Sequence, residues 1–461
     1  MRKRSKLWSG SIVLAMGTFI AKIFGMFYRI PLTNMLGCYG LGLYQMIFPV
    51  YTVLLDFSGA GVPSALSRLI SAFSKEERYI KAGEYLRASI RLLVILGLIG
   101  TLVMAIASKG FAIAQGDVNS TLGYVFLSPA VVIVCLISCL RGYFQGQMNM
   151  VPTAISQVVE QVVKLAFGLL FVYLLLPDVK RAVAGAAFAI TVSEFSALIQ
   201  LFITYKIDKK KHDNFLSLQN DTTKIKEITP LNLLTKHSIK TTVPITITGI
   251  LIPIAHVIDS LLVVNLISVY RADATVLFGI SSGVVCTIIN LPVALCYGVA
   301  TTSIPAVSSL NNNEEQNKTA KKAVLITIGV SFAFTIATFF GAELIIKILF
   351  RNLSIQEKQT AISLLKLTSP TILLLSIVQT TNGILIGKGR LYLPVLTLGG
   401  GIVLKTVISF LTLSNPSINI YGSAIALIAC YFAVGLVNLI LIFTLKAKDG
   451  NKKINRGQCH A

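Results

Sequence analysis

The chain has 461 residues, of which 54% are hydrophobic and only 13% are charged, and its mean hydropathy is +0.76. Soluble globular proteins carry about 25% charged residues, so this composition excludes a water-soluble globular fold. The net charge of +22 is spread over the segments between apolar stretches and no nucleic-acid-binding motif accompanies it, so anionic membrane lipids are the expected partners and nucleic acid is not.

Apolar stretches that are long enough to cross about 30 Å of hydrocarbon recur along the whole chain, and they predict about twelve transmembrane helices. The first stretch follows a basic start and is too long for the apolar region of a cleaved signal peptide, so we expect a retained helix. The predicted spans are 8–30, 41–70, 88–108, 122–144, 152–177, 182–205, 239–270, 276–309, 323–350, 363–387, 392–413 and 420–446.

Lys and Arg residues concentrate on one side of these spans. Of the 41 Lys and Arg residues, 28 lie in segments on the same side as the N-terminus and 9 lie on the opposite side. Because translocation of Lys and Arg is disfavoured, we expect both termini in the cytoplasm. The segment 347–366 fits this pattern poorly and is expected to lie at the membrane interface.

A long polar stretch near the middle divides the chain. It predicts an N-terminal six-helix lobe at 1–205, a cytoplasmic linker at 206–235, a C-terminal six-helix lobe at 236–446 and a cytoplasmic tail at 447–461.

The two halves carry matching residues in register, running from a Ser-Pro pair through two glycines and a proline to a lysine. The matched residues are Ser128, Pro129, Gly142, Gly146, Pro152 and Lys164 in the first half and Ser369, Pro370, Gly383, Gly387, Pro394 and Lys405 in the second, at offsets of 241 or 242. Each half has an even number of spans, so both copies enter the membrane in the same sense and form parallel repeats. This organisation predicts a two-lobed transporter with a central cavity.

Enzymatic motifs are not found in the sequence. His212, His237, His256 and His460 lack metal-ligand spacing, and there is no phosphate-binding loop or nucleophile motif. The seven cysteines are an odd number and most lie in apolar spans, so a disulfide framework is not expected. We therefore expect no catalytic residue, no metal and no cofactor.

Ionisable residues within the predicted spans are the candidates for function, because each costs about 2.5 to 3.5 kcal/mol to insert and usually faces a cavity or a partner. Lys22 and Arg29 share one face of the first helix, two turns apart. Glu160 and Lys164 have the spacing of an intrahelical ion pair, which is either structural or part of a cavity. Asp56, Glu194 and Asp259 are candidate sites for a coupling cation or proton, with a packing role as the alternative.

The residues Leu-Arg-Gly-Tyr-Phe-Gln-Gly-Gln-Met-Asn-Met at 140–150, together with Gln-Val-Val-Glu-Gln-Val-Val-Lys at 157–164, resemble the stage V sporulation protein B family. This family belongs to the multidrug, oligosaccharidyl-lipid and polysaccharide exporter superfamily. The segments 40–44 and 61–69 are similar to the second-helix region of the same family.

The resemblance implies a flippase in the bacterial cytoplasmic membrane. Its substrate would be a polyprenyl-pyrophosphate-linked sugar, such as the peptidoglycan precursor lipid II, used for cell-wall, spore-cortex or polysaccharide synthesis. The resemblance also implies that Lys22 and Arg29 bind the pyrophosphate in the cavity, that Na⁺ or H⁺ drives transport, and that cell-wall synthesis proteins are partners. The related lipid II flippases carry arginines in the second helix, where this chain has Asp56, so the choice of lipid-linked sugar stays open.

Two other functions stay open. A cation-coupled multidrug exporter of the same superfamily would share the two-lobed fold, although two cations on the first helix favour an anionic substrate. A non-transporting scaffold of a wall-synthesis complex is the second alternative, and it would not move lipid across the membrane.

Overall fold

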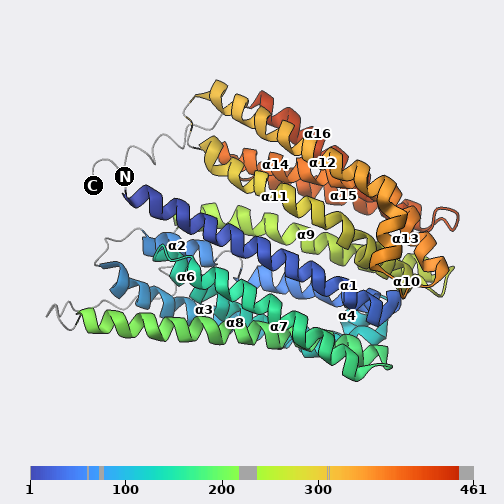
Figure 1. The fold of residues 1–461 in the computed structure, drawn as a ribbon, viewed down its shortest axis with the longest axis horizontal. Helices are drawn as coiled ribbons and strands as arrows, with labels where there is room; N and C mark the ends of the chain where they lie inside the picture. Colours follow the sequence, from blue (N-terminus) through green and yellow to red (C-terminus); the bar gives the residue numbers. More distant parts are fainter. Residues whose placement is uncertain are drawn as a thin grey trace. The chain divides into compact units, whose positions relative to one another are not determined.

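The computed structural model describes residues 2–59, 62–71, 77–216, 236–308, 310 and 312–445, and these residues fold almost entirely into helices (Figure 1). Eleven helical segments of the described chain are long and apolar enough to cross a membrane. The main helices are α1 (Arg2–Gly59), α2 (Val62–Ser71), α3 (Glu77–Ile106), α4 (Ser108–Ala114), α5 (Thr121–Leu127), α6 (Pro129–Gly146), α7 (Val151–Leu175), α8 (Val179–Leu216), α9 (Lys236–Ser268), α10 (Ala274–Phe278), α11 (Cys286–Ser308), α12 (Asn313–Leu349), α13 (Ile355–Thr368), α14 (Pro370–Gly387), α15 (Leu393–Leu413) and α16 (Tyr421–Thr444).

The first two predicted spans lie in α1, which is broken at Gly37. This residue has φ 67° and ψ 179° inside an otherwise helical stretch, a conformation that glycine adopts without steric cost. The candidate span Ile23–Phe57 includes this break. The eleven segments therefore agree with about twelve predicted spans.

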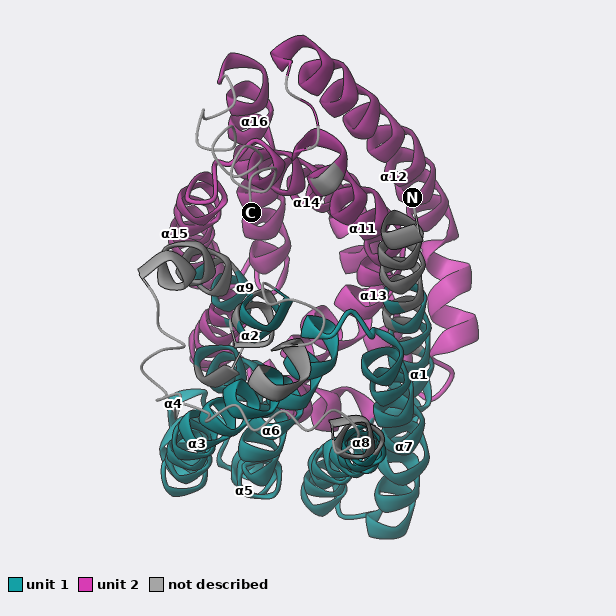
Figure 2. Cartoon of the chain, turned by 90° about the vertical axis from the view of Figure 1, so that its left-hand side faces the viewer, with its two compact units in different colours: residues 1–36, 46–253 teal, residues 37–45, 254–461 magenta. Residues whose placement is uncertain are grey.

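Two compact units make up the chain (Figure 2): residues 1–36 and 46–253 form unit 1, and residues 37–45 and 254–461 form unit 2. One apolar cluster in unit 1 is built on Phe144, Leu86 and Ile137. A corresponding cluster in unit 2 contains Ile384, Leu385 and Ile442. The predicted lobes 1–205 and 236–446, and the relation of one to the other by a repeat axis, stay predictions.

Prolines begin the helices at matched places in the two units. Pro129 and Pro370 stand at the start of α6 and α14, and Pro152 and Pro394 stand at the start of α7 and α15. Proline fits there because the first backbone N–H groups of a helix have no intrahelical acceptor. The matched prolines therefore stand at helix starts, although the predicted spans 122–144 and 363–387 had placed two of them inside a span.

The ends of α6 and α14 also match. Met148 and Gly389 both have positive φ, 63° and 78°. After each, a backbone N–H reaches back to close the helix: Asn149 donates to Phe144 O, and Arg390 donates to Leu385 O, both at 2.9 Å. The same left-handed turn therefore follows the helix in both units, with glycine in only one of them.

Glycines permit close packing of these helices. A Cβ added at Gly146 would lie 2.7 Å from Ile70 Cβ, and one added at Gly383 would lie 2.5 Å from Ala300 O. The small residues of the matched segments thus allow α6 to approach α2 and α14 to approach α11, as small residues do in membrane helix pairs.

In unit 2, a seven-residue π-helical segment, Gly279–Val285, joins α10 to α11. Residues 37–45 pack against it so closely that a Cβ on Gly42 or Gly279 would collide with backbone oxygens. Gln45 Nε2 donates to Ser282 O at 2.6 Å. The start of the second predicted span is therefore fixed to the helical segment that follows α10.

The structure differs from the predicted boundaries in two places. Helix α8 continues to Leu216, beyond the predicted end at 205, and the rest of the predicted linker from 217 to 235 lies outside the described residues, as does the tail 447–461. Within 347–366, α13 begins with a capping box, in which Ser354 and Glu357 exchange side-chain to backbone hydrogen bonds. The span predicted at 363–387 is therefore two helices, α13 and α14.

Candidate functional site

Helix α7 carries a stripe of polar residues through a candidate membrane span. Gln157, Glu160, Gln161 and Lys164 recur at spacings of three and four residues, so they share one helical face. Polar groups at membrane depth are costly and usually face other protein groups or water. This stripe is the centre of the candidate site in unit 1.

Glu160 is paired with Arg141 of the neighbouring helix α6. Arg141 Nη2 lies 3.1 Å from Glu160 Oε2, and both side chains are largely buried. Arg141 Nε also donates to Ser156 Oγ at 3.0 Å, and Gln161 Nε2 donates to Glu160 Oε1 at 2.8 Å. The spacing of Glu160 and Lys164 suggested a pair within α7, but the structure gives this carboxylate a partner on another helix.

Lys164 is left without a hydrogen-bond acceptor or an ion-pair partner among the described residues. Its Nζ lies 5.9 Å from the ring centroid of Tyr28 on α1, within the range of a cation–π contact. Tyr28 is held against α7 because Gly168 leaves room for it: a Cβ at Gly168 would lie 2.5 Å from the ring. The ammonium group is therefore positioned by an aromatic ring, and its hydrogens remain available to a ligand.

Arg29 and Glu194 complete the electrostatic surroundings of Lys164. The charges of both, and that of Glu160, act on its ammonium group. Glu194, on α8, is 7% exposed, and it makes no ion pair within the described part of the chain. Among the described side chains, three cations (Arg29, Arg141 and Lys164) thus meet two carboxylates, a formal excess of one positive charge that suits an anion.

Two predicted residues of unit 1, Lys22 and Asp56, stand apart from this description for different reasons. The side chain of Lys22 lies outside the described residues. Asp56 is half-buried near the end of α1 and forms no ion pair with a described residue. Their predicted roles are therefore neither supported nor opposed by contacts.

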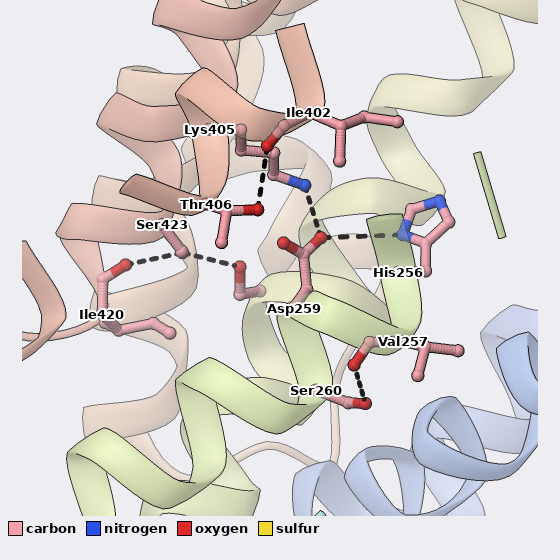
Figure 3. Close-up of polar contacts among 10 residues, drawn as sticks. His256, Val257, Asp259, Ser260, Ile402, Lys405, Thr406, Ile420 and Ser423 are labelled. Carbon is pink, nitrogen blue, oxygen red and sulfur yellow. Dashed lines mark hydrogen bonds and ion pairs between the residues drawn. The ribbon is translucent and has the colours of Figure 1, made fainter. Parts of the chain in front are cut away.

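The third predicted acidic residue, Asp259 of α9, lies in unit 2. Its Oδ2 accepts a hydrogen bond from Lys405 Nζ of α15 at 2.5 Å (Figure 3). His256 Nδ1 is 3.9 Å from the same oxygen. Asp259 is therefore the acceptor of a membrane-embedded ion pair, with a histidine one turn away.

Sequence analysis did not assign two residues of these clusters. Arg141, near the end of the predicted span 122–144, was given no role, yet it lies within α6 and pairs with Glu160. Lys405 was recognised as the repeat partner of Lys164 but not as the partner of Asp259. The sequence does indicate that each charged residue within a membrane span needs an oppositely charged partner. Which residue serves as that partner depends on how helices distant in sequence pack together.

The comparison with protein families decides the class of the protein. A family described as polysaccharide biosynthesis protein matches residues 7–311. The chain belongs to this family. This family is one of transporters and not of enzymes.

Relatives from Bacillus subtilis (strain 168) extend the match over nearly the full chain. Lipid II flippase MurJ is 26% identical, with 95% of this chain and 82% of the relative covered. Stage V sporulation protein B is also 26% identical, over 95% of this chain and 85% of the relative. Uncharacterized membrane protein YabM is 26% identical over 98% and 82%.

Solved structures establish the fold. An inward-facing multidrug resistance MATE family transporter of the MOP superfamily has a TM-score of 0.68 at 16% identity, covering 92% of this chain and 94% of that one. A MOP superfamily transporter from Pyrococcus furiosus, whose binding pocket is described as having reverse polarity, has a TM-score of 0.66 at 17% identity, with 95% of each chain covered. The protein is thus a multi-pass membrane protein with a MATE-like fold.

Proposed function

We propose that this protein moves a polyprenyl-pyrophosphate-linked sugar, such as lipid II, from the inner to the outer leaflet of the bacterial cytoplasmic membrane by alternating access between two lobes. The observation that carries the proposal is Lys164: a membrane-embedded ammonium with no acceptor among the described residues, beside Arg29 and in a cluster of net positive charge. The similarity to a lipid II flippase supports the same substrate class.

The chemistry of a diphosphate explains why such a cluster is needed. A diphosphate in a low-dielectric site loses its hydration, and only fixed charges and hydrogen-bond donors can replace it. Lys164 carries three donors, and the guanidinium of Arg29 adds a second fixed positive charge. The Arg141–Glu160 pair keeps the carboxylate of Glu160 occupied, so that it does not neutralise Lys164.

Lys22 is proposed to capture the substrate first. Seven residues at 1.5 Å each separate Lys22 from Arg29 by roughly 10 Å along the helix axis, which is too far for both to hold one phosphate. The headgroup would therefore pass from Lys22 to Arg29 and Lys164. A normally inserted Lys22→Ala protein is expected to lose complementation of a flippase-depleted strain, whereas Lys22→Arg should retain much of it.

Reconstituted vesicles test the proposal directly. Fluorescently labelled lipid II, a second undecaprenyl-linked sugar and a cationic dye are offered to the purified protein in parallel. We expect movement of a lipid-linked sugar and none of the dye. Movement of the dye alone would identify the multidrug exporter, and movement of neither substrate would favour the scaffold.

The proposed orientation places both termini and the segment between Lys206 and Lys240 in the cytoplasm, because 28 of the 41 Lys and Arg residues lie on that side. A single cysteine placed in this segment should resist a membrane-impermeant thiol reagent in intact cells and react after the cells are opened. Labelling in intact cells would reverse the orientation. Coupling through Asp56 or Glu194, and contacts with cell-wall synthesis proteins, remain parts of the proposal.

A further inference from the structure

Helix α14 of unit 2 is enclosed by its neighbours on almost every side. Helices α11, α12 and α16 all pack against it, and every residue from 371 to 387 is buried or half-buried. Among the described large apolar side chains that are exposed, none belongs to α14, whereas α12 exposes Phe332, Ile336 and Phe340 along one face. Helix α14 is therefore an inner helix of its unit, without the exposed apolar face that a helix presents to lipid.

A single strip of α14 keeps partial access. Leu375, Gln379, Asn382 and Ile386 are half-buried, and every other residue from 376 to 387 is buried. Their spacing of three and four residues places them on one face of the helix. Gln379 and Asn382 are the tenth and thirteenth residues of this 18-residue helix, which is itself a candidate membrane span. The accessible strip thus carries two carboxamides near the middle of the span, between two apolar side chains.

The hydroxyl groups beside this strip, on the enclosed faces of α14, are satisfied within the protein. Thr380 shares a hydrogen bond with Thr327 of α12 at 2.9 Å. Thr381 donates to Ile377 O at 2.8 Å and accepts from Asn438 Nδ2 of α16 at 3.1 Å. These contacts tie α14 to its neighbours, so a structural role accounts for both hydroxyls.

The two carboxamides of the strip, by contrast, keep hydrogen-bonding groups to spare. Asn382 Oδ1 accepts from Asn438 Nδ2 at 2.9 Å, but Asn382 Nδ2 donates to no described residue. Gln379 makes no hydrogen bond with the described part of the chain, and its Oε1 is buried. A carboxamide offers two donors and one acceptor oxygen, and leaving them unused at membrane depth is unfavourable. The strip therefore suits a ligand that both donates and accepts hydrogen bonds.

Charge narrows the class of this ligand. The four residues of the strip are uncharged, so they offer no counter-charge to a phosphate or to a cationic drug. The hydroxyl and N-acetyl groups of a sugar donate and accept hydrogen bonds without charge, as carboxamides do. Leu375 and Ile386 give the strip the mainly apolar lining, with a few placed polar groups, that is usual for binding sites.

We infer that Gln379 and Asn382 form a sugar-binding site on α14 and contribute to the choice of the sugar that the protein carries. The hydrogen bond from Asn438 engages the oxygen of Asn382 and leaves its nitrogen to the ligand. Gln379, one turn away, supplies a second donor pair and an acceptor. That the sugar is lipid-linked rests on the proposed function, so the accessibility of the strip and its ligand are tested separately.

The first experiment requires no substrate. Gln379→Cys in proteoliposomes should react with a small hydrophilic methanethiosulfonate reagent, above the background of the native cysteines, because the strip is open to a polar ligand. Ile336→Cys is the matched control: Ile336 is 42% exposed, more than Gln379, but it lies on the apolar face of α12 and should be shielded by lipid. A Gln379→Cys protein that is as unreactive as Ile336→Cys would overturn the inference.

The second experiment compares two lipids that share a diphosphate. Lipid II, which carries a sugar, and undecaprenyl diphosphate, which carries none, are titrated against the purified protein in detergent. The wild type should bind lipid II more tightly. Gln379→Leu breaks no hydrogen bond of the described structure, and it should weaken binding of lipid II by roughly 3- to 10-fold, as expected for lost hydrogen bonds, while binding of undecaprenyl diphosphate stays unchanged.

The control for binding is Thr380→Val, which removes a hydroxyl from an enclosed face of the same helix and should leave the ratio of the two affinities unchanged. An unchanged ratio in Gln379→Leu would overturn the sugar site and leave the proposed function in place. Failure of the wild type to bind either lipid would refute the proposed function, and the sugar site with it.

Discussion

Lys164 in unit 1 and Lys405 in unit 2 occupy matched positions, 241 residues apart, yet their surroundings differ. Lys405 donates to Asp259 at 2.5 Å, whereas Lys164 faces the ring of Tyr28, and the nearby Glu160 is engaged by Arg141. A repeat fixes where a lysine enters the membrane, but its neighbours decide whether its charge is neutralised within the protein or remains available. We propose that the two units have divided the work on this basis.

The largest expected effect is on the transport rate when Lys164 is replaced. Lys164→Met should lower the rate of lipid-linked sugar movement by roughly 30-fold or more. The substitution removes the cation that pairs with the diphosphate of the substrate, and the loss of one member of a desolvated charge pair costs about 2 to 5 kcal/mol. Lys164→Arg should retain a substantial part of the rate, since it keeps the positive charge. The measurement is the initial rate in proteoliposomes at equal protein content. An unaltered rate in Lys164→Met would remove this residue from substrate binding.

The second-largest expected effect is a difference between Lys405 and Lys164 in their contributions to the stability of the protein. Lys405→Met leaves Asp259 enclosed without its partner and should destabilise the protein by about 3 to 5 kcal/mol, whereas the addition of Asp259→Asn should restore most of the loss. Lys164→Met should change stability much less, because Lys164 has no ion-pair partner among the described residues. Thermal unfolding in detergent tests all three proteins. Equal losses in the two single variants would contradict the distinction.

A smaller effect concerns the matched turns after α6 and α14. Met148 and Gly389 both have positive φ, a conformation that costs a residue with a side chain roughly 1 to 2 kcal/mol. Met148→Gly should therefore raise the unfolding temperature slightly, and Gly389→Ala should lower it. The same sign for both substitutions would show that side-chain packing, and not the backbone, governs these turns.

The smallest effect is expected at an exposed pair between α9 and α10. Arg271 Nη2 lies 2.7 Å from Asp273 Oδ2, and hydrogen bonds from Arg271 lower the pKa of Asp273. A lowered carboxyl pKa stabilises the fold above the unfolded value of about 3.9, and the gain is lost as pH falls through the folded value. Asp273→Asn should cost under about 1 kcal/mol at neutral pH.

Measurements at acid pH are the control for the Arg271–Asp273 pair. The difference between wild type and Asp273→Asn in thermal unfolding should be constant from pH 7 to about 5 and should shrink only below about pH 4. If the stability difference between the two proteins disappeared near neutral pH, a titratable group other than Asp273 would be responsible for it.

Much of the fold was predictable because it depends on local sequence. Apolar length predicted the spans. The matched prolines Pro129 and Pro370 fell inside the predicted spans 122–144 and 363–387, whereas the structure places each of them at a helix start. The break at Gly37 falls between the predicted spans 8–30 and 41–70. The separate helix α13 was harder to predict, because a mixed segment continues into the next span there. Hydropathy measures the mean character of a window, whereas a single backbone angle or capping box sets the boundary.

The candidate sites were predictable only in part. Charge within an apolar span drew attention to Glu160, Lys164 and Asp259, but the partners of Glu160 and Asp259 lie on other helices. Asp259 and Lys405 are separated by 146 residues, and no local spacing relates them. The choice between Lys164 and Arg141 as the partner of Glu160 depends on how α6 packs on α7, which the sequence of α7 alone does not contain.

The most direct test of the division between the units is the initial rate of labelled lipid II movement in proteoliposomes for wild type, Lys164→Met and Asp259→Asn/Lys405→Met. We predict that Lys164→Met fails, because the substrate loses a membrane-embedded cation. The double variant removes a pair whose charges neutralise each other within the protein, so it is expected to keep most of the wild-type rate. Full activity in Lys164→Met, or a loss in the double variant as large as that in Lys164→Met, would contradict the account.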